Sequence, residues 1–254
     1  MTAVLLILVL SPFIGSFLGV LADRLPRGES VIVPRSSCRS CATPLSARDL
    51  LPALSYLLSR GQCRHCGAAI PPWLLYTELA AFGLALIAVA LGGTPFIIVL
   101  SAIILWLSLT LTITDIIWFR LPDPLTGAML VSALMWSAIT GVPSLNLAIF
   151  GAVLGAGSFL VIRLAYRGLR GREGLGLGDV KLMAGLGALV GPHLVPAMVL
   201  VAALGALGAA LLRPRRLSAT SALPFGAALS ISAALLWVLN RSGLISGFGI
   251  FLSP

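Results

Sequence analysis

The 254-residue sequence has few charged residues, because Asp, Glu, Lys and Arg make up 10% of it, against about 25% in soluble domains. Only 8 residues are acidic, and Lys181 is the single lysine among the basic residues. Hydrophobic residues make up 59% of the chain and the mean hydropathy is +1.07, which excludes an ordinary soluble domain. The net charge of +9 would suit nucleic-acid binding, but in a membrane protein basic residues gather in cytoplasmic loops. We therefore predict an integral membrane protein with no nucleic-acid partner.

The N-terminus lacks the basic residues that begin a secretory signal peptide. No positive side chain precedes the apolar run at 3–22, whereas Arg24 and Arg27 follow it directly. This polarity is the reverse of a signal peptide's. We therefore expect a retained first helix whose N-terminus lies outside.

Apolar runs predict an all-α polytopic membrane protein with about eight transmembrane helices. A crossing needs roughly 20 apolar residues, and most of the runs reach that length. With the N-terminus outside, 16 of the 17 Lys and Arg residues fall on the cytoplasmic side, with Arg241 as the exception. Both termini are then expected outside. The predicted helices are 3–22, 73–92, 95–114, 124–141, 146–165, 180–191, 194–212 and 221–240.

One long polar segment, 23–72, separates the first helix (1–22) from the remaining seven (73–254), and we treat these three parts as domains. It contains all four cysteines, in two C-x-x-C pairs separated by 21 residues. Two such pairs supply the four thiolates of a tetrahedral Zn²⁺ site, and disulfides are rare on the reducing side of the membrane. We predict a cytoplasmic, zinc-ribbon-like loop with structural zinc; free or redox-active thiols are the alternative. The ligands would be Cys38, Cys41, Cys63 and Cys66.

Two acids, Asp115 and Asp179, are expected at helix ends on the cytoplasmic face, with Asp123 close by. Two adjacent carboxylates cannot both ionise easily, so one keeps a proton. The carboxylate can then take a proton from water while the acid protonates a peptide carbonyl oxygen, as in aspartic proteases. Gly174, Gly176 and Gly178 precede the second acid, and their bare backbone would allow an extended peptide to approach.

These charges also fit other functions. Asp115 could mark the membrane edge, Asp179 could be an N-cap, and Lys181 could be an ion-pair partner rather than a substrate contact. Intramembrane acids also serve proton relays, so an ion-coupled transporter using Asp115 and Asp179 is an alternative. A zinc-containing membrane scaffold without catalysis is another.

The motifs resemble those of the type IV prepilin peptidases, a family of membrane aspartic proteases. "GLGLGDVKLMAGLGALVG" is similar to the family's GxGD motif, and "TDIIWFRLPDPLT" to the segment of its first aspartate. "GSFLGVLADRLPRGES", the paired C-x-x-C motifs and "LPFG" at 223–226 occur in the same order as in the family. The combination is far more specific than a GxGD alone.

The resemblance implies an enzyme of the bacterial cytoplasmic (inner) membrane that cuts the basic leader from type IV prepilins and pseudopilins at the cytoplasmic face. It implies Asp115 and Asp179 as the catalytic pair, with Asp123, Gly176, Gly178 and Lys181 in supporting positions. Many members also N-methylate the new terminal residue with S-adenosylmethionine. Gly19 stands where the family usually has Asn, and this departure concerns methyl transfer rather than cleavage.

Overall fold

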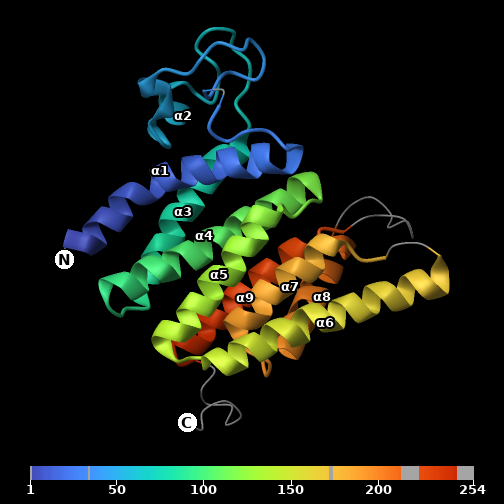
Figure 1. Ribbon diagram of the computed structural model, residues 1–254. Helices are drawn as coiled ribbons and strands as arrows, with labels where there is room; N and C mark the ends of the chain where they lie inside the picture. The colour runs from blue at the N-terminus through green and yellow to red at the C-terminus, as the bar shows by residue number, and fades with distance from the viewer. Residues whose placement is uncertain (1, 34, 172–173, 213–222, 245–254) are drawn as a thin grey trace. The chain divides into compact units, whose positions relative to one another are not determined.

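The computed structural model describes residues 2–33, 35–171, 174–212 and 223–244, and its long elements are all helices. Eight of these helices have 14 residues or more, which confirms the predicted all-α architecture (Figure 1). Four of them are long and apolar enough to cross a membrane, and two shorter helices are also apolar. The eight are α1 (Thr2–Arg24), α3 (Pro72–Ala90), α4 (Pro95–Trp118), α5 (Asp123–Thr140), α6 (Leu145–Arg170), α7 (Leu177–Val190), α8 (Val195–Leu211) and α9 (Phe225–Arg241).

The chain divides into two compact units, 1–110 and 111–254, and the division falls inside α4. In the first unit, α1 packs against α3. A Cβ at Gly15 would lie 2.7 Å from the Cα of Glu78, and one at Gly19 would lie 3.1 Å from the side chain of Leu74. Two glycines four residues apart let the backbones approach closely, as in small-xxx-small helix pairs. The contacts run in opposite directions along the two helices, so α1 and α3 are antiparallel.

In the second unit, α7 is the central helix, since it packs against α5, α6 and α9 (Figure 1). Almost every residue from Val180 to Val190 is buried, so this short helix is apolar on all sides because protein surrounds it. Gly151 of α6 and Gly187 of α7 face each other with no room for a Cβ on either. The remaining apolar helix, α8, packs against α9.

Several helix ends differ from the predicted ones. α4 continues to Trp118, one turn beyond the predicted end, and stops where Phe119 takes a positive φ of 51°. α7 begins at Leu177 with Gly176 as its N-cap, so the interpretation of Asp179 as an N-cap is wrong. α9 begins at Phe225, because Pro224 precedes it as N-cap. The predicted start of this last helix at 221, and the loop 213–220, lie outside the described residues.

The segment between α1 and α3 has little regular structure. It contains two single 3₁₀ turns, η1 (Leu25–Arg27) and η2 (Ala47–Leu50), and one five-residue helix, α2 (Leu54–Leu58). Isolated bridges join Ser37 to Pro44 and Gln62 to Ala69. With so little buried surface of its own, the segment depends on other contacts to hold its shape.

Candidate active site and metal centre

The structure brings Asp115 and Asp179 together in the second unit, as predicted. Asp115 lies near the end of α4 and is 6% exposed, and Asp179 is the third residue of α7 and partly buried. An ideal Cβ built on Gly226 would lie 3.1 Å from Oδ1 of Asp179 and 3.2 Å from Oδ2 of Asp115. Both carboxylates therefore face one point in space, and their oxygens are no farther apart than the sum of these two distances.

The start of α9 orients the first of these acids. The backbone N–H of Ala227 donates a 2.7 Å hydrogen bond to Oδ2 of Asp115, and the backbone of Gly226 bonds the same side chain. Asp115 and Ala227 are 112 residues apart in the sequence. Backbone donors at a helix N-terminus are suited to a carboxylate. Sequence reasoning assigned no role to Gly226 or Ala227, although "LPFG" belonged to the resemblance.

Close packing explains three of the glycines. A Cβ on Gly178 would lie 3.0 Å from the Cβ of Leu121, and one on Gly226 would lie 2.8 Å from the Cδ1 of the same leucine. Leu121 therefore sits between the start of α7 and the start of α9. A Cβ on Gly176 would lie 3.2 Å from Oδ2 of Asp179, and the Gly176 backbone hydrogen-bonds that side chain. Because these glycines lack side chains, their own backbone and the side chain of Leu121 can lie close to the two carboxylates.

α6 holds the glycine-rich segment from the other side. Arg163 is 7% exposed, and its guanidinium donates a hydrogen bond to the carbonyl oxygen of Leu175. The ring of Tyr166 lies against Gly174, where a Cβ would come within 2.6 Å of it. Arg163 and Tyr166 are three residues apart and share one helix face. Sequence reasoning treated Arg163 only as a basic residue beside a loop, so this positioning contact was missed.

Asp123 and Lys181 form an ion pair at the starts of α5 and α7. The Nζ of Lys181 lies 2.7 Å from both carboxylate oxygens of Asp123. The two side chains are 69% and 49% exposed, so the pair stabilises the fold by only about 0–1 kcal/mol. It connects the helix that carries Asp179 to the LPD segment. The interpretation of Lys181 as an ion-pair residue therefore fits the structure, and its partner is Asp123.

Neutralising either partner should therefore modestly reduce the leader cleavage that the resemblance implies, without unfolding the protein. We expect Lys181→Met and Asp123→Asn each to lower kcat several-fold, because helix α7 loses one restraint close to Asp179. The charge-swapped variant Asp123→Lys/Lys181→Asp should recover part of the loss, measured by cleavage rates in a double-mutant cycle. A swap that is no better than the single variants would indicate that Lys181 contacts the substrate instead.

The four cysteines of the first unit also come together. Their sulfur atoms all lie within 4.8 Å of one another, so they form a cluster able to hold a metal ion. The Sγ atoms of Cys38 and Cys66 are 3.8 Å apart, which is about the edge of a tetrahedron with Zn–S bonds of about 2.3 Å. The four cysteines are free thiols, so no disulfide joins them.

The two C-x-x-C turns repeat the same backbone geometry. The N–H of Cys38 donates to the carbonyl of Thr43, and the N–H of Cys63 donates to the carbonyl of Ala68. In each turn the residue after the second cysteine, Ala42 or Gly67, has a positive φ and bonds back to the first cysteine. Each hairpin thus presents two sulfurs from one tight turn, as tetrahedral thiolate sites require.

The sulfurs differ in acidity. Hydrogen bonding with the side chain of Thr43 lowers the pKa of Cys41 to about 6. The backbone of Ala68 lowers the pKa of Cys66, but burial and the three neighbouring thiols outweigh it and raise this pKa to about 11. Four thiolates at this spacing repel one another, and a divalent cation between them would remove that repulsion.

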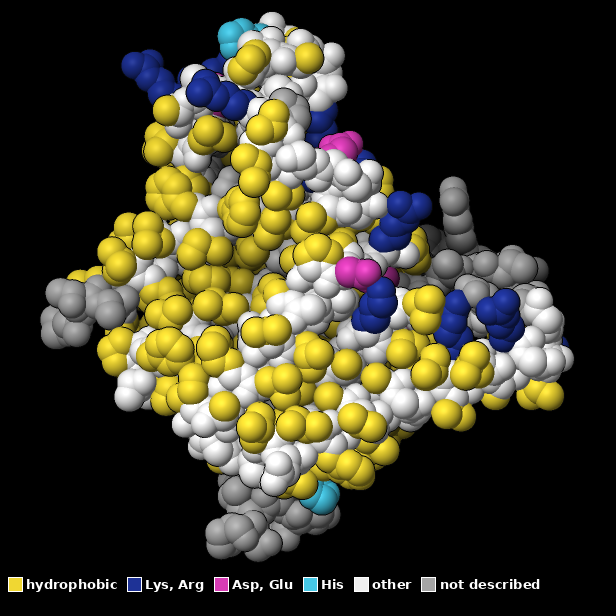
Figure 2. Space-filling model, viewed as in Figure 1, with side chains coloured by type: hydrophobic (Ala, Val, Ile, Leu, Met, Phe, Trp, Pro, Cys, Tyr) yellow, Lys and Arg dark blue, Asp and Glu magenta, His cyan; other side chains and the backbone are white. Residues whose placement is uncertain are grey.

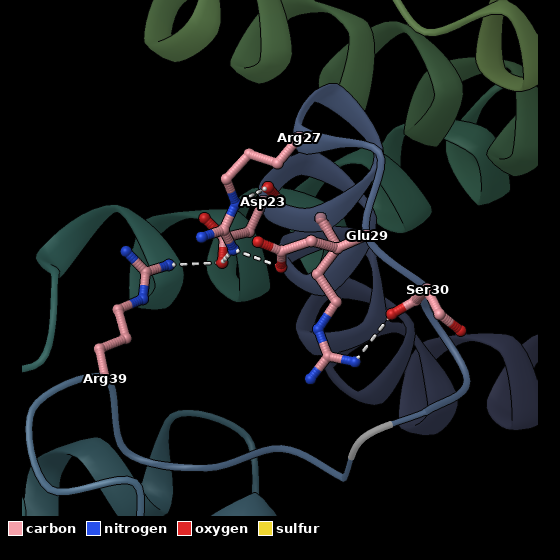
Figure 3. A network of polar contacts seen from close by, with 6 residues as sticks. Asp23, Arg27, Glu29, Ser30 and Arg39 are labelled. Carbon is pink, nitrogen blue, oxygen red and sulfur yellow. Dashed lines mark hydrogen bonds and ion pairs between the residues drawn. The ribbon is translucent and has the colours of Figure 1, made fainter.

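Ion pairs attach the first cysteine turn to α1 (Figure 3). Arg39, inside the first C-x-x-C, lies 3.0 Å from Oδ2 of Asp23, and Arg27 binds the same oxygen at 2.7 Å. Glu29 accepts a second contact from Arg27 at 3.1 Å. The corresponding arginine of the second turn, Arg64, lies 3.4 Å from Asp49. The arginines of both turns therefore have carboxylate partners.

Comparison with known proteins assigns both units. The model of the bacterial peptidase A24 N-terminal domain matches residues 9–91, and that of the type IV leader peptidase family matches residues 102–211. The chain is 35% identical to a prepilin leader peptidase/N-methyltransferase of Aeromonas hydrophila, over 91% of this chain and 90% of the relative. Proteins of the same name from Dickeya chrysanthemi and Neisseria gonorrhoeae are 36% and 31% identical, each over 94% of this chain and 93% and 92% of their own lengths. No solved structure matches the chain.

Proposed function

The chain belongs to the type IV prepilin leader peptidase/N-methyltransferase family, and we propose that it cleaves the basic leader of type IV prepilins and pseudopilins with Asp115 and Asp179. The observation that carries this proposal is the convergence of both carboxylates on the point that a Cβ of Gly226 would occupy. Asp23 and Glu29 also lie close together, since both bind Arg27, but Glu29 is half-exposed.

The geometry suits general acid–base hydrolysis. The ionised carboxylate takes a proton from a water molecule, whose oxygen then attacks the carbonyl carbon of the scissile peptide bond. The protonated carboxyl gives its proton to the carbonyl oxygen, which yields a tetrahedral intermediate. The first carboxyl then passes the proton it took from water to the leaving nitrogen as the C–N bond breaks, and a hydroxyl of the intermediate returns a proton to the second carboxylate. The N–H of Ala227 keeps the carboxylate of Asp115 turned toward this point. Gly178 leaves room for Leu121 beside the start of α7, and Gly176 leaves room for the carboxylate of Asp179.

We further propose that the chain spans the bacterial inner membrane with both termini outside and the aspartates at the cytoplasmic face. The placement of 16 of 17 Lys and Arg residues supports this orientation. A prepilin whose hydrophobic stem lies in the bilayer would then present its scissile bond at the height of the aspartates. The division into a first helix (1–22), a loop (23–72) and a peptidase domain (73–254) stays a prediction.

For the metal centre we propose Zn²⁺ held by Cys38, Cys41, Cys63 and Cys66, with a structural role, because the sulfur spacing and the paired turns suit tetrahedral coordination.

Purified protein should contain one zinc per chain by elemental analysis. Cys38→Ser or Cys66→Ser should lose most of this zinc and lower the melting temperature, whereas Ser40→Ala, between the first two ligands, should not. A protein that keeps its stability after complete removal of the metal would contradict a structural role.

The second activity in the relatives' names, N-methylation of the new terminal residue with S-adenosylmethionine, is proposed for this chain on family membership alone. The described residues contain no glycine-rich nucleotide loop, so we assign no residue to this cofactor. Gly19, the departure from the family pattern, lies in the contact between α1 and α3 against Trp73 and Leu74. A larger side chain there would press on Leu74.

One experiment tests both activities. Purified protein in lipid is incubated with a prepilin and S-adenosylmethionine, and the products are analysed by mass spectrometry. We expect loss of the leader and, if the chain methylates, a gain of about 14 Da on the new N-terminus. Proton-linked uptake in liposomes without any cleaved product would overturn the peptidase proposal in favour of a transporter.

A further inference from the structure

The short helix α2 exposes three leucines on one face. The side chains of Leu54, Leu57 and Leu58 are 50%, 65% and 68% exposed, and their spacing of three and four residues places them on the same side of the helix. The opposite side is used for packing, since the ring of Tyr56 lies within 2.9 Å of a Cβ built on Gly61, just before the second cysteine turn. The helix is therefore held by its Tyr56 side and leaves its leucine side uncovered.

A partly buried contact places α2 beside the membrane-spanning helices. Ala53, the residue before α2, donates a 2.6 Å hydrogen bond from its backbone N–H to Oε2 of Glu78 in α3. Glu78 is six residues from the start of α3 at Pro72, or about 9 Å along the helix axis. The side chain of Ser16 in α1 hydrogen-bonds the same carboxylate. The start of α2 therefore lies beside the first two turns of α3, close to the end of that helix that meets the bilayer surface.

Basic and aliphatic side chains lie together next to α2. A hollow of about 410 Å³ is lined by Arg24, Val31, Ile32, Arg35, Ser36, Leu45, Ala47 and Leu50. Leu50 belongs to η2, which packs against α2, and the side chain of Ile32 is 84% exposed. Figure 2 shows hydrophobic and basic side chains interspersed over this part of the molecule, which Figure 1 draws around α2. Guanidinium groups beside aliphatic side chains match an anionic headgroup and the first carbons of its acyl chains.

We propose that the leucine face of α2 and this hollow form an interfacial membrane anchor that binds anionic phospholipid. The segment 25–71 leaves the membrane at the end of α1 and re-enters it at the start of α3, and the two helices are antiparallel. Both of its ends are thus tied to the same bilayer surface, and the leucines need no large movement to enter it. Insertion would hold the four-cysteine cluster at a set height above the membrane through the contact between Tyr56 and Gly61.

A photoreactive side chain tests what covers the leucines. Benzoylphenylalanine is placed at Leu57 or Leu58 in the full-length chain, reconstituted in nanodiscs of phosphatidylcholine with or without phosphatidylglycerol. A matched control carries it at Ala69, an exposed residue of the same segment in the second cysteine hairpin. After illumination we expect mass spectrometry to detect phospholipid adducts at Leu57 and Leu58, in higher yield when phosphatidylglycerol is present. At Ala69 we expect no such adducts. Equal adduct yields at all three positions would overturn the proposal.

Two further measurements distinguish lipid binding from substrate binding and from the peptidase proposal. Adding a prepilin to the nanodiscs tests the competing occupant: adducts that move from lipid to the prepilin would show that the leucines bind substrate, and would overturn the lipid anchor. The measurement is repeated in the Asp179→Asn variant, because lipid adducts do not require cleavage. A failure of the peptidase proposal would leave the adducts unchanged, and a failure of the anchor proposal would leave cleavage unchanged. Labelled proteins that keep their metal content show that the substituted segment is folded.

Discussion

Replacing either Asp115 or Asp179 by asparagine should abolish leader cleavage while leaving the protein inserted and folded. Asparagine has nearly the same shape, and its side-chain oxygen can still accept the hydrogen bond that Ala227 donates to Asp115. It cannot take a proton from water or give one to a carbonyl oxygen. We expect cleavage to fall by about 10⁴-fold, the upper range for general acid–base catalysis, in a time course followed by gel shift or mass spectrometry.

A carboxylate outside the site provides the control. Glu29→Gln removes a half-exposed acid that pairs with Arg27 in the first unit, and it should leave the cleavage rate unchanged. Metal content and thermal unfolding should be the same for all three variants, which separates a catalytic defect from misfolding. If either aspartate variant still processes a prepilin at more than a few per cent of the normal rate, the pair is not the catalytic one. If the aspartate variants are active and the cysteine variants are not, the result supports the alternative hypothesis of a zinc-containing membrane scaffold without catalysis.

The positions of the helices could be predicted from the sequence, but the contacts between them could not. Hydrophobic length and basic residues predicted all eight long helices, with most ends within a few residues, because burial in lipid demands a long apolar run wherever a helix crosses. α5 starts at Asp123, one residue before its predicted start at 124. The end of α4 was placed too early, at 114, because the charged Asp115 interrupts the apolar run; the helix continues through "IIW" to Trp118 and ends before Phe119, whose φ is positive.

The contacts that complete the site have no local signal. The hydrogen bond from Ala227 to Asp115 joins residues 112 positions apart, and nothing in the residues near Ala227 indicates such a partner. Likewise, Arg163 looks like any basic residue at a helix end until the structure shows its guanidinium buried against the carbonyl of Leu175. Such contacts depend on how α6, α7 and α9 pack, which is settled by the whole unit. The cysteine cluster was easier to predict, because each C-x-x-C motif places two metal ligands within four residues of sequence.

Replacing Gly226 by alanine should eliminate cleavage as completely as removing an aspartate, although it adds a single methyl group. That methyl would lie 2.8 Å from Leu121 and within 3.2 Å of an oxygen of both Asp115 and Asp179. Carbon atoms normally pack at about 3.5–4.0 Å, so the side chain of Leu121 must turn away, and either the two carboxylates must give way by a few tenths of an ångström or the start of α9 must shift. A movement of the carboxylates or of α9 also alters the bond from Ala227 to Asp115, since Ala227 is the next residue. The added methyl would occupy the place where water and the scissile carbonyl must meet both acids.

The matched control for Gly226 is Gly157→Ala, in the middle of α6, where a Cβ would have nothing within 4 Å. Alanine in a helix is favoured over glycine by roughly 0.5–1 kcal/mol, so this variant should be active and slightly more stable. We expect Gly226→Ala to retain metal and remain in the membrane but to give no cleaved prepilin, whereas Gly226→Ser should be equally inactive because it too carries a Cβ. A fully active Gly226→Ala protein would mean that the two carboxylates do not work at the point they share, and the proposed pairing of Asp115 with Asp179 would have to be abandoned.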